Sequence, residues 1–145
     1  STGWKKKNKH FKDANISEDL RFCSREYLSK CRKRILTYIP NKGANMLDFA
    51  SGPIQYKEYL LYSKNFNSRH CVDFSKDAIK FAKLQLGKKG KYYCKDFLDI
   101  KFKENYFDCI LSLHTIYHIN KFKQKKVIRK ILSISKKKYA SCNRL

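Results

Sequence analysis

Residues 46–53 constrain the fold of this chain more than any other stretch. Met-Leu-Asp-Phe is an apolar run that contains an acid, and the small residues Ala-Ser-Gly-Pro follow it at once. Helix-forming sequence comes next, from Gln55 to Ser63. A strand with such a turn is typical of nucleotide sites in α/β proteins, because the acid and exposed backbone N–H groups lie at the strand's carboxyl end, near a helix N-terminus.

Strands and helices alternate after this turn. The pattern predicts strands at 45–49, 69–73, 91–94 and 106–113, and the beginning of a fifth at 138–142. It predicts helices at 54–63 and 121–134, and a third that is capped by Ser75 and ended by the glycines at 87 and 90. Alternation of this kind favours a parallel sheet with crossover helices.

The length of 145 residues fits a single domain over 1–145. Within it we expect a basic arm at 1–16, which is either mobile or folded over a site, and a nucleotide-binding core at 45–145. Between them, apolar residues recur at three- and four-residue steps, which predicts a helix over 17–39 with Ser17 as its N-cap and Pro40 beyond its end.

Charge and composition limit the kinds of partner that the chain is expected to have. The net charge of +22 invites a nucleic-acid interpretation. Most of the basic residues are lysines spread along the chain, however, and arginine, the main base-reading residue, is scarce. No apolar run approaches the roughly 20 residues that cross a bilayer, and no signal peptide is recognisable. We therefore expect a cytoplasmic protein without membrane contact.

The six cysteines form no C-x-x-C pair, so zinc-ribbon spacing is absent. Cys71, Cys94 and Cys109 lie in apolar runs that are typical of buried strands. This favours buried free thiols in a reducing compartment over disulfides.

Four segments follow one another, each at the carboxyl end of an expected strand. They are Leu-Asp-Phe-Ala-Ser-Gly at 47–52, Val-Asp-Phe-Ser at 72–75, Lys-Asp-Phe at 95–97 and Phe-Asp-Cys-Ile-Leu-Ser-Leu-His at 107–114. In order and spacing the set resembles class I S-adenosylmethionine-dependent methyltransferases, over roughly residues 20–142. The resemblance implies a Rossmann-like, mostly parallel sheet with helices on both faces, and S-adenosylmethionine as the cofactor.

The resemblance also implies roles for single residues. The segment 48–52 matches the motif at the methionine part of the cofactor, where small residues let the backbone come close. Asp73 matches the acid that holds both ribose hydroxyls, and Asp96 and Phe97 match the carboxylate and the ring beside adenine. Helix capping is the alternative role for each acid. The expected cofactor residues are Asp48, Ala50, Ser51, Gly52, Asp73, Phe74, Asp96, Phe97 and Leu113.

Methyl transfer from a sulfonium is an in-line displacement that needs no protein nucleophile and no metal, so positioning dominates. An oxygen acceptor also benefits from a general base. His114 and His118 follow the fourth strand, where the family places acceptor-facing groups, and are the candidate catalytic residues. Tyr56 and Tyr117 are the candidate substrate contacts. The alternative role for His118 is to close its loop by a backbone hydrogen bond.

The acceptor is expected to be a small molecule methylated on oxygen or nitrogen. The segment after the fourth strand lacks the Asn-Pro-Pro-Tyr type of sequence that is found in methyltransferases acting on bases and glutamine. Two alternatives stay open. One is a non-catalytic or partner-requiring module of the same fold, and the other is an RNA-directed methyltransferase, which the charge motivates.

Two departures from the family pattern carry expectations of their own. Ala50 and Ile54 stand where the family usually has glycines, and Ala50 is tolerated there if its φ angle is negative. The final antiparallel hairpin of the fold has no counterpart in this sequence. We expect that the sequence is a fragment, that another chain supplies the missing strands, or that this is a degenerate minimal form of the fold. An open sheet edge would invite a second chain or a homodimer.

Overall fold

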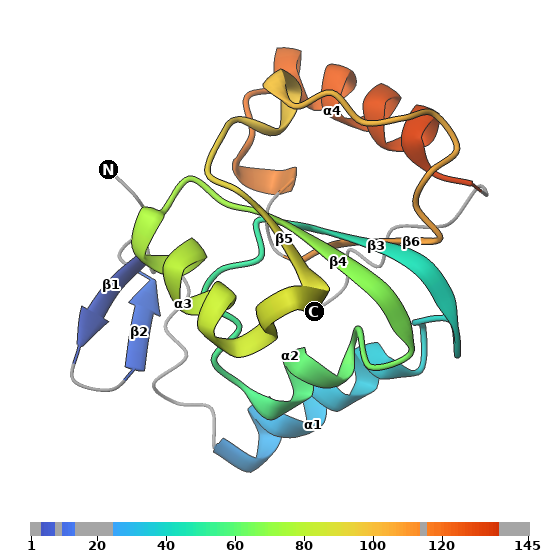
Figure 1. The fold of residues 1–145 in the computed structure, drawn as a ribbon. Coiled ribbons are helices and arrows are strands. Elements are labelled where there is room, and N and C mark those ends of the chain that lie inside the picture. Colours follow the sequence, from blue (N-terminus) through green and yellow to red (C-terminus); the bar gives the residue numbers. More distant parts are fainter. Residues whose placement is uncertain (1–3, 8–9, 14–24, 114–115, 137–145) are drawn as a thin grey trace.

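The computed structural model describes residues 4–7, 10–13, 25–113 and 116–136 (Figure 1). Four parallel strands form its central sheet, in the order β5-β4-β3-β6. They are β3 (Gly43–Phe49), β4 (Phe66–Val72), β5 (Gly90–Tyr93) and β6 (Cys109–Ser112). Of these four strands β3 comes first in the sequence, and it lies between β4 and β6, so the chain changes direction across the sheet at β3. This is the arrangement at which open α/β sheets bind their ligands.

Helices cover both faces of the sheet, as expected. The helices α1 (Arg25–Leu36), α2 (Lys57–Leu61) and α3 (Lys76–Leu86) lie below the sheet in Figure 1, and α4 (Lys121–Ile134) lies above it. In the part of the chain that the structure describes, single turns of 3₁₀ helix join the elements at η2 (Gly87–Lys89), η3 (Phe97–Asp99) and η4 (Ile116–His118). The predicted α/β fold is thus confirmed within the described residues.

Alternation along β3 sorts the core into two layers. Met46 packs with Ile35 of α1, whereas Leu47 and Phe49 point to the opposite face and pack with Val127 of α4. Each of these five apolar side chains is at most 7% exposed. Since both faces of β3 are covered, the strand is fixed in position, and so is the turn that leaves its carboxyl end.

Two expected helix boundaries shift. The helix expected at 54–63 is confined to Lys57–Leu61, because the turn after β3 extends to residue 56. The helix expected at 17–39 ends at Leu36, before Pro40, and residues 14–24 lie outside the described part of the chain. The third helix is confirmed: Ser75 Oγ accepts from Ala78 N, and Gly87, with φ +56°, ends the helix.

The segment expected as a basic arm contains two strands instead. They are β1 (Trp4–Lys7) and β2 (His10–Asp13), which pair antiparallel with Trp4 opposite Asp13 (Figure 1). Lysine is a poor strand former and the stretch lacks apolar alternation, so its composition concealed the pairing.

The sheet continues beside β6 by one bridge. Ser135, just beyond α4, pairs parallel with Phe107, and Lys136 N donates to Phe107 O over 2.9 Å. The predicted strand 106–113 is shorter than expected, since β6 begins at Cys109. The strand predicted at 138–142 lies outside the described residues.

The cysteine expectation holds in part. Cys71 and Cys109 are buried and Cys31 is partly buried, and all three are free thiols. Cys94 is also free, but it is exposed, because β5 ends one residue earlier at Tyr93. In the described residues no helix is long and apolar enough to cross a bilayer.

Candidate cofactor site

The turn after β3 has an unusual backbone. Ala50, Gly52 and Ile54 have φ angles of +60°, +61° and +52°. A negative φ, the condition under which alanine would be tolerated at position 50, is therefore not met. Glycine adopts such angles without a steric penalty, whereas a residue with a Cβ does so at a cost. The chain holds Ala50 and Ile54 in a shape that glycine would adopt more easily.

Hydrogen bonds fix this turn to the neighbouring strand. Ser51 N donates to Val72 O over 3.1 Å, and Gly52 N donates to Asp73 Oδ2 over 2.9 Å. These two N–H groups are used inside the protein, which corrects the expectation that the turn exposes its N–H groups to a ligand. What the turn can offer a ligand is its small side chains and its carbonyl oxygens.

Asp73 is the acid that organises this end of the sheet. It follows β4 directly and is 8% exposed. Its second oxygen, Oδ1, accepts from Ser75 N over 2.8 Å at the beginning of α3. One carboxylate therefore holds the turn after β3 and the cap of α3 in register. A carboxylate has about four acceptor sites, so its orientation by backbone N–H groups is compatible with a bond to a ligand diol.

Asp48 has a different role from the one expected. Its side chain points to the α1–α3 face, where Oδ2 accepts from Arg69 Nη2 at 2.5 Å and from Arg69 Nε at 3.0 Å. Arg69 is 2% exposed, and it also donates to Tyr59 O and Ser63 Oγ. We therefore revise Asp48 from a cofactor contact to one half of a buried ion pair beneath the turn.

Asp96 and Phe97 follow β5. Asp96 caps η3, with Oδ1 accepting from Leu98 N over 2.9 Å, and its Oδ2 lies 3.8 Å from Lys123 Nζ. Phe97 is 2% exposed, and its ring centroid lies 4.6 Å from that of Phe49. A ring covered in this way supports the core, and its expected role as the cover of adenine is revised accordingly.

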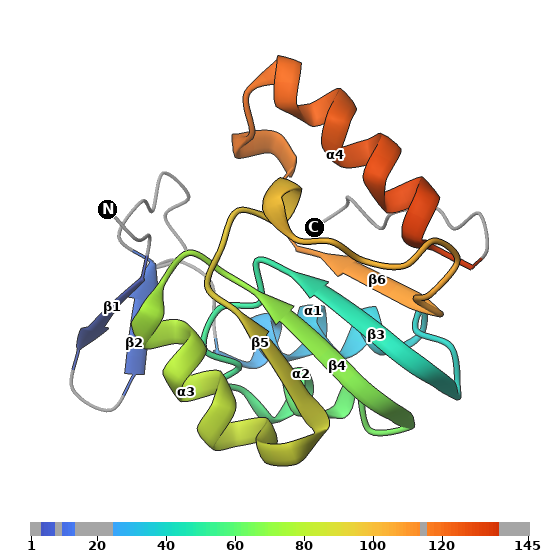
Figure 2. The ribbon, with the colours of Figure 1, turned by 45° about the horizontal axis from the view of Figure 1, so that its top comes forward.

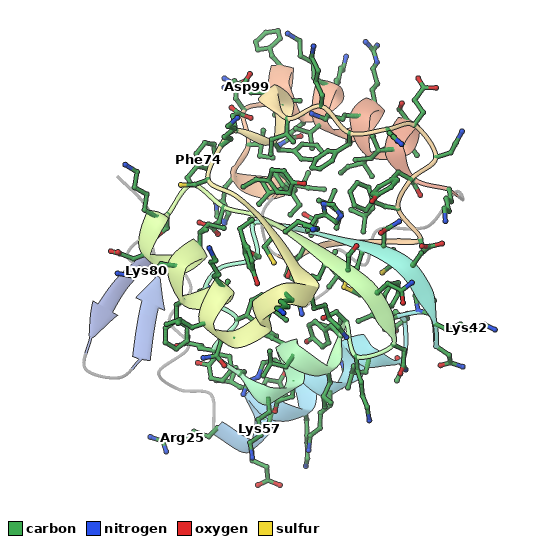
Figure 3. All side chains as sticks on the ribbon, viewed as in Figure 1. Arg25, Lys42, Lys57, Phe74, Lys80 and Asp99 are labelled. Carbon is green, nitrogen blue, oxygen red and sulfur yellow. The ribbon has the colours of Figure 1, made fainter. Side chains whose placement is uncertain are left out.

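Phe74 carries an exposed ring at this end of the sheet. It is 65% exposed, next to Asp73. Figure 3 shows Phe74 where β4 leads into α3, at the opposite end of the sheet from Lys42. An exposed aromatic ring beside a held carboxylate can lie against a nucleobase or a ribose.

The residues expected near the acceptor follow β6. Leu113 is partly buried and packs with the core below the sheet. His118 ends η4 and is exposed. His114 lies outside the described residues, and so does the side chain of Tyr117.

Tyr56 is held by residues of α1 and α2. It precedes α2 as its N-cap, is 37% exposed, and the Arg32 guanidinium lies 3.9 Å above the centre of its ring. The ring of Tyr59 lies 5.4 Å from that of Tyr56 between centroids. Together with the cation–π contact, it holds Tyr56 on the face formed by α1 and α2.

Two buried basic residues of β4, Arg69 and His70, are not among the site residues expected from the sequence. The strand sequence Phe-Asn-Ser-Arg-His-Cys-Val is largely polar before Cys71, so it does not signal that Arg69 is buried. His70 Nδ1 lies 2.9 Å from Tyr93 Oη, and burial lowers the pKa of the imidazole to about 4. At neutral pH this imidazole is uncharged and a weak base, so it is unsuited to take a proton from an acceptor. Cys71 points to the other face, where it packs with Ile54 and Ala82.

Desolvation dominates the other shifts near the turn. Burial raises the pKa of the Cys71 thiol to about 12 and that of Tyr59 to about 12. Both groups therefore stay protonated at neutral pH. Across the described residues, no three His, Cys, Asp or Glu side chains are grouped to hold a metal ion.

The chain belongs to the methyltransferase domain family, whose model matches residues 47–138. The match begins within β3 and includes the turn, Asp73, Asp96 and α4. The predicted resemblance to class I methyltransferases is thereby confirmed. No curated protein sequence matches the chain.

Solved structures agree with this fold. The cyclase SpnF superposes with a TM-score of 0.64 at 17% identity, over 77% of this chain and 42% of its own. A Haloferax volcanii complex with the Trm112 methyltransferase activator gives 0.61 at 20%, over 72% and 46%. Phosphoethanolamine N-methyltransferase 1 of Haemonchus contortus, solved with phosphoethanolamine and S-adenosylhomocysteine, gives 0.58 at 15%, over 70% and 22%. The chain thus spans less than half the length of each of these structures.

Proposed function

We propose that this chain binds S-adenosylmethionine at the carboxyl ends of β3, β4 and β5 and places its methyl group against an acceptor beyond β6. The observation that carries the proposal is the junction of Gly52 and Asp73. This hydrogen bond joins a turn of small residues to a buried carboxylate at β3, where the path of the chain across the sheet changes direction. The family match over residues 47–138 supports the same reading.

The residues present fit the chemical groups of this cofactor. The diol of a ribose can donate to the carboxylate of Asp73, whose two oxygens are oriented by Gly52 and Ser75. Carbonyl oxygens of the turn suit the ammonium group of a methionine moiety. The exposed ring of Phe74 offers apolar cover at the same end of the sheet, and Asp96 can accept from an exocyclic amine.

When bound, S-adenosylmethionine supplies an electrophilic methyl group. The chain's part is to hold an acceptor in line and to exclude water. An acceptor hydroxyl or ammonium must also lose a proton. His114 and His118 remain the proposed bases, because they follow β6 and because the buried His70 is too weak a base. Tyr117 is the proposed acceptor contact.

We place the acceptor among small molecules. Phosphoethanolamine, the ligand of the Haemonchus contortus relative, is one such compound, and it is a fitting first probe. The test is the formation of S-adenosylhomocysteine from S-adenosylmethionine with pools of small amines and alcohols. Turnover with such a pool supports the proposal. Turnover only with RNA, together with RNA binding that weakens steeply as salt rises, would reassign the acceptor to nucleic acid.

A partner-requiring domain is the second candidate. One similar structure is a complex with the Trm112 methyltransferase activator. In the described residues of our chain, the sheet beside β6 is continued by the single bridge of Ser135 to Phe107. The discriminating measurement is turnover by the isolated, monodisperse chain. A monomer that turns over removes this candidate. A chain that binds the cofactor and is inactive until a second protein is added supports it.

A further inference from the structure

Helix α4 carries polar side chains that face the sheet side of the molecule rather than solvent. Lys130 Nζ donates to Phe97 O over 2.5 Å and also to Ile100 O, at the two ends of η3. The same ammonium group lies 4.7 Å from the ring centre of Phe97 and 5.6 Å from that of Phe102. Lysine side chains on a helix usually extend their charge to water, so this inward placement needs a reason.

The surroundings of Lys130 show what the placement achieves. Burial lowers the pKa of its ammonium group, whereas the nearby Asp96 and Asp99 carboxylates raise it. Its donors hold the carbonyls of η3, the turn that Asp96 begins. Figures 1 and 2 both show η3, in yellow, beside the orange helix α4. Lys130 therefore fixes the loop that follows β5.

A second side chain of α4 holds the other loop. Gln124 Nε2 donates to Ile116 O over 3.1 Å and to Ile119 O over 2.8 Å. These two carbonyls belong to η4 and the residue after it, so both amide hydrogens of Gln124 fix the loop that follows β6. Its neighbour Lys123 approaches Asp96 at 3.8 Å. Adjacent residues of one helix thus reach one loop each.

The two loops that α4 holds lie at different parts of the proposed site. The loops follow β5 and β6, which form opposite edges of the described sheet. In the proposed function, the loop after β5 lies at the nucleoside part of the cofactor and the loop after β6 lies at the acceptor. Residues 124 and 130 are about 9 Å apart along the helix axis. A rigid helix that holds both loops transmits the position of one to the other.

We propose that α4 couples the cofactor loop, residues 96–100, to the acceptor loop, residues 116–119, with Lys130 and Gln124 as the positioning residues of the two loops. This inference rests on the proposed function. It means that cofactor binding at Asp96 orders the acceptor loop. By linkage, a bound acceptor tightens cofactor binding in return. Neither side chain touches the reacting atoms in this account.

The test uses S-adenosylhomocysteine as the probe, with calorimetry for affinity and amide hydrogen exchange for the loops. Lys130→Met keeps the apolar stem and removes the donors, and Lys130→Arg restores donors. Lys126→Met is the matched control, because Lys126 is an exposed lysine of the same helix. We expect Lys130→Met to weaken S-adenosylhomocysteine binding about tenfold and to speed exchange at 97–100. Lys130→Arg should recover part of both losses, and the control should match the wild type.

Gln124→Met separates coupling from simple packing. We expect it to bind S-adenosylhomocysteine within about threefold of the wild type and yet to lose the protection that the ligand induces at 116–119. Exchange in β3 and β4 should be unchanged in every variant, which excludes general loosening. Ligand-induced protection at 116–119 that persists in Gln124→Met would overturn the coupling.

The result distinguishes this inference from the proposed function. If the wild-type chain binds no S-adenosylhomocysteine, the proposed function fails. The anchoring of the loops is then judged by hydrogen exchange without ligand. If the wild type binds and Lys130→Met binds equally well with unchanged exchange at 97–100, the role of α4 is refuted and the proposed function stands.

Discussion

The turn after β3 makes a prediction whose sign is decided by one angle. Replacing Ala50 by glycine should stabilise the protein, although glycine in a strand or helix usually weakens one. The φ angle of Ala50 is +60°, and the left-handed region costs an L-residue roughly 1–2 kcal/mol. Against this gain stands the larger entropy that glycine has in the unfolded chain, about 0.5–1 kcal/mol. The net gain therefore lies between 0 and about 1.5 kcal/mol, with a midpoint of about 0.75 kcal/mol.

A matched control isolates the effect of the angle. Ala44 lies in β3, and its φ is not among the positive ones of the described residues. Ala44→Gly should therefore lose about 0.5–1 kcal/mol. The two variants make the same chemical change a few residues apart and should move stability in opposite directions.

Urea denaturation measures both variants, with the midpoint reporting stability and an unchanged slope confirming that the compactness of the two states is unaltered. For a domain of this size, 1 kcal/mol corresponds to about 2–4 °C in melting temperature, so a thermal scan gives a second reading. Equal destabilisation by Ala50→Gly and Ala44→Gly would refute the reasoning, because it would mean that Ala50 carries no strain.

At Ile54 the cost of a positive φ angle is smaller than the gain from packing a buried side chain. Its φ is +52°, yet its side chain is fully buried against Cys71 and Ala82. Truncating a buried isoleucine costs roughly 2–5 kcal/mol, which exceeds the strain of a single residue. The chain therefore retains Ile54 for its packing, and its glycine variant would be less stable.

Three further predictions concern the burial of single side chains. Arg69→Met leaves Asp48 buried without its partner and should lower the free energy of unfolding, measured by urea denaturation, by about 3–5 kcal/mol. Adding Asp48→Leu should recover much of that loss. If the effects of the two substitutions on stability simply added, the pairing of Asp48 with Arg69 would be contradicted. The pKa of His70 is lowered from 6.5 to about 4, so between these pH values the unfolded chain binds a proton that the folded chain does not bind. The free energy of unfolding should therefore fall by up to about 3 kcal/mol as the pH falls from 6.5 to 4. If His70→Phe shows the same dependence of stability on pH as the wild type, His70 is not its cause. Cys94 is exposed, whereas Cys71 is buried with its pKa raised to about 12. Mass-spectrometric mapping after iodoacetamide treatment at pH 8 should therefore find Cys94 alkylated before Cys71, and equal rates at the two thiols would argue against the burial of Cys71.

Much of the fold could be read from the sequence, because hydrophobic periodicity fixes the kind of each element. The run at residues 46–49 and the cap at Ser75 were unambiguous signals, and the structure confirms both. Boundaries were less certain, because Pro40 limits a helix without saying where its last turn lies. The paired strands at 4–13 were missed, since their lysines carry no pattern and the pairing is made by the backbone.

The candidate site was predicted less completely, for a physical reason. Sequence places an acid at a strand's end, but not the face to which it points. Asp73 lies where expected, whereas Asp48 points beneath the sheet to Arg69, a partner 21 residues away that no local signal links to it. Similarly, the Asp-Phe pairs at 73–74 and 96–97 are alike in sequence. Burial alone separates the exposed ring of Phe74 from that of Phe97 in the core.

The central claim is that Asp73 and the turn joined to it form a cofactor site, and one titration tests it most directly. Calorimetry with S-adenosylhomocysteine should show saturable 1:1 binding to the wild-type chain. Asp73→Asn should weaken it by about tenfold or more, the range expected for hydrogen bonds to a charged group. Asp77→Asn, an exposed acid four residues further along, should bind as the wild type does. A folded wild-type chain that binds no S-adenosylhomocysteine, or an Asp73→Asn variant that binds it equally well, would contradict the account.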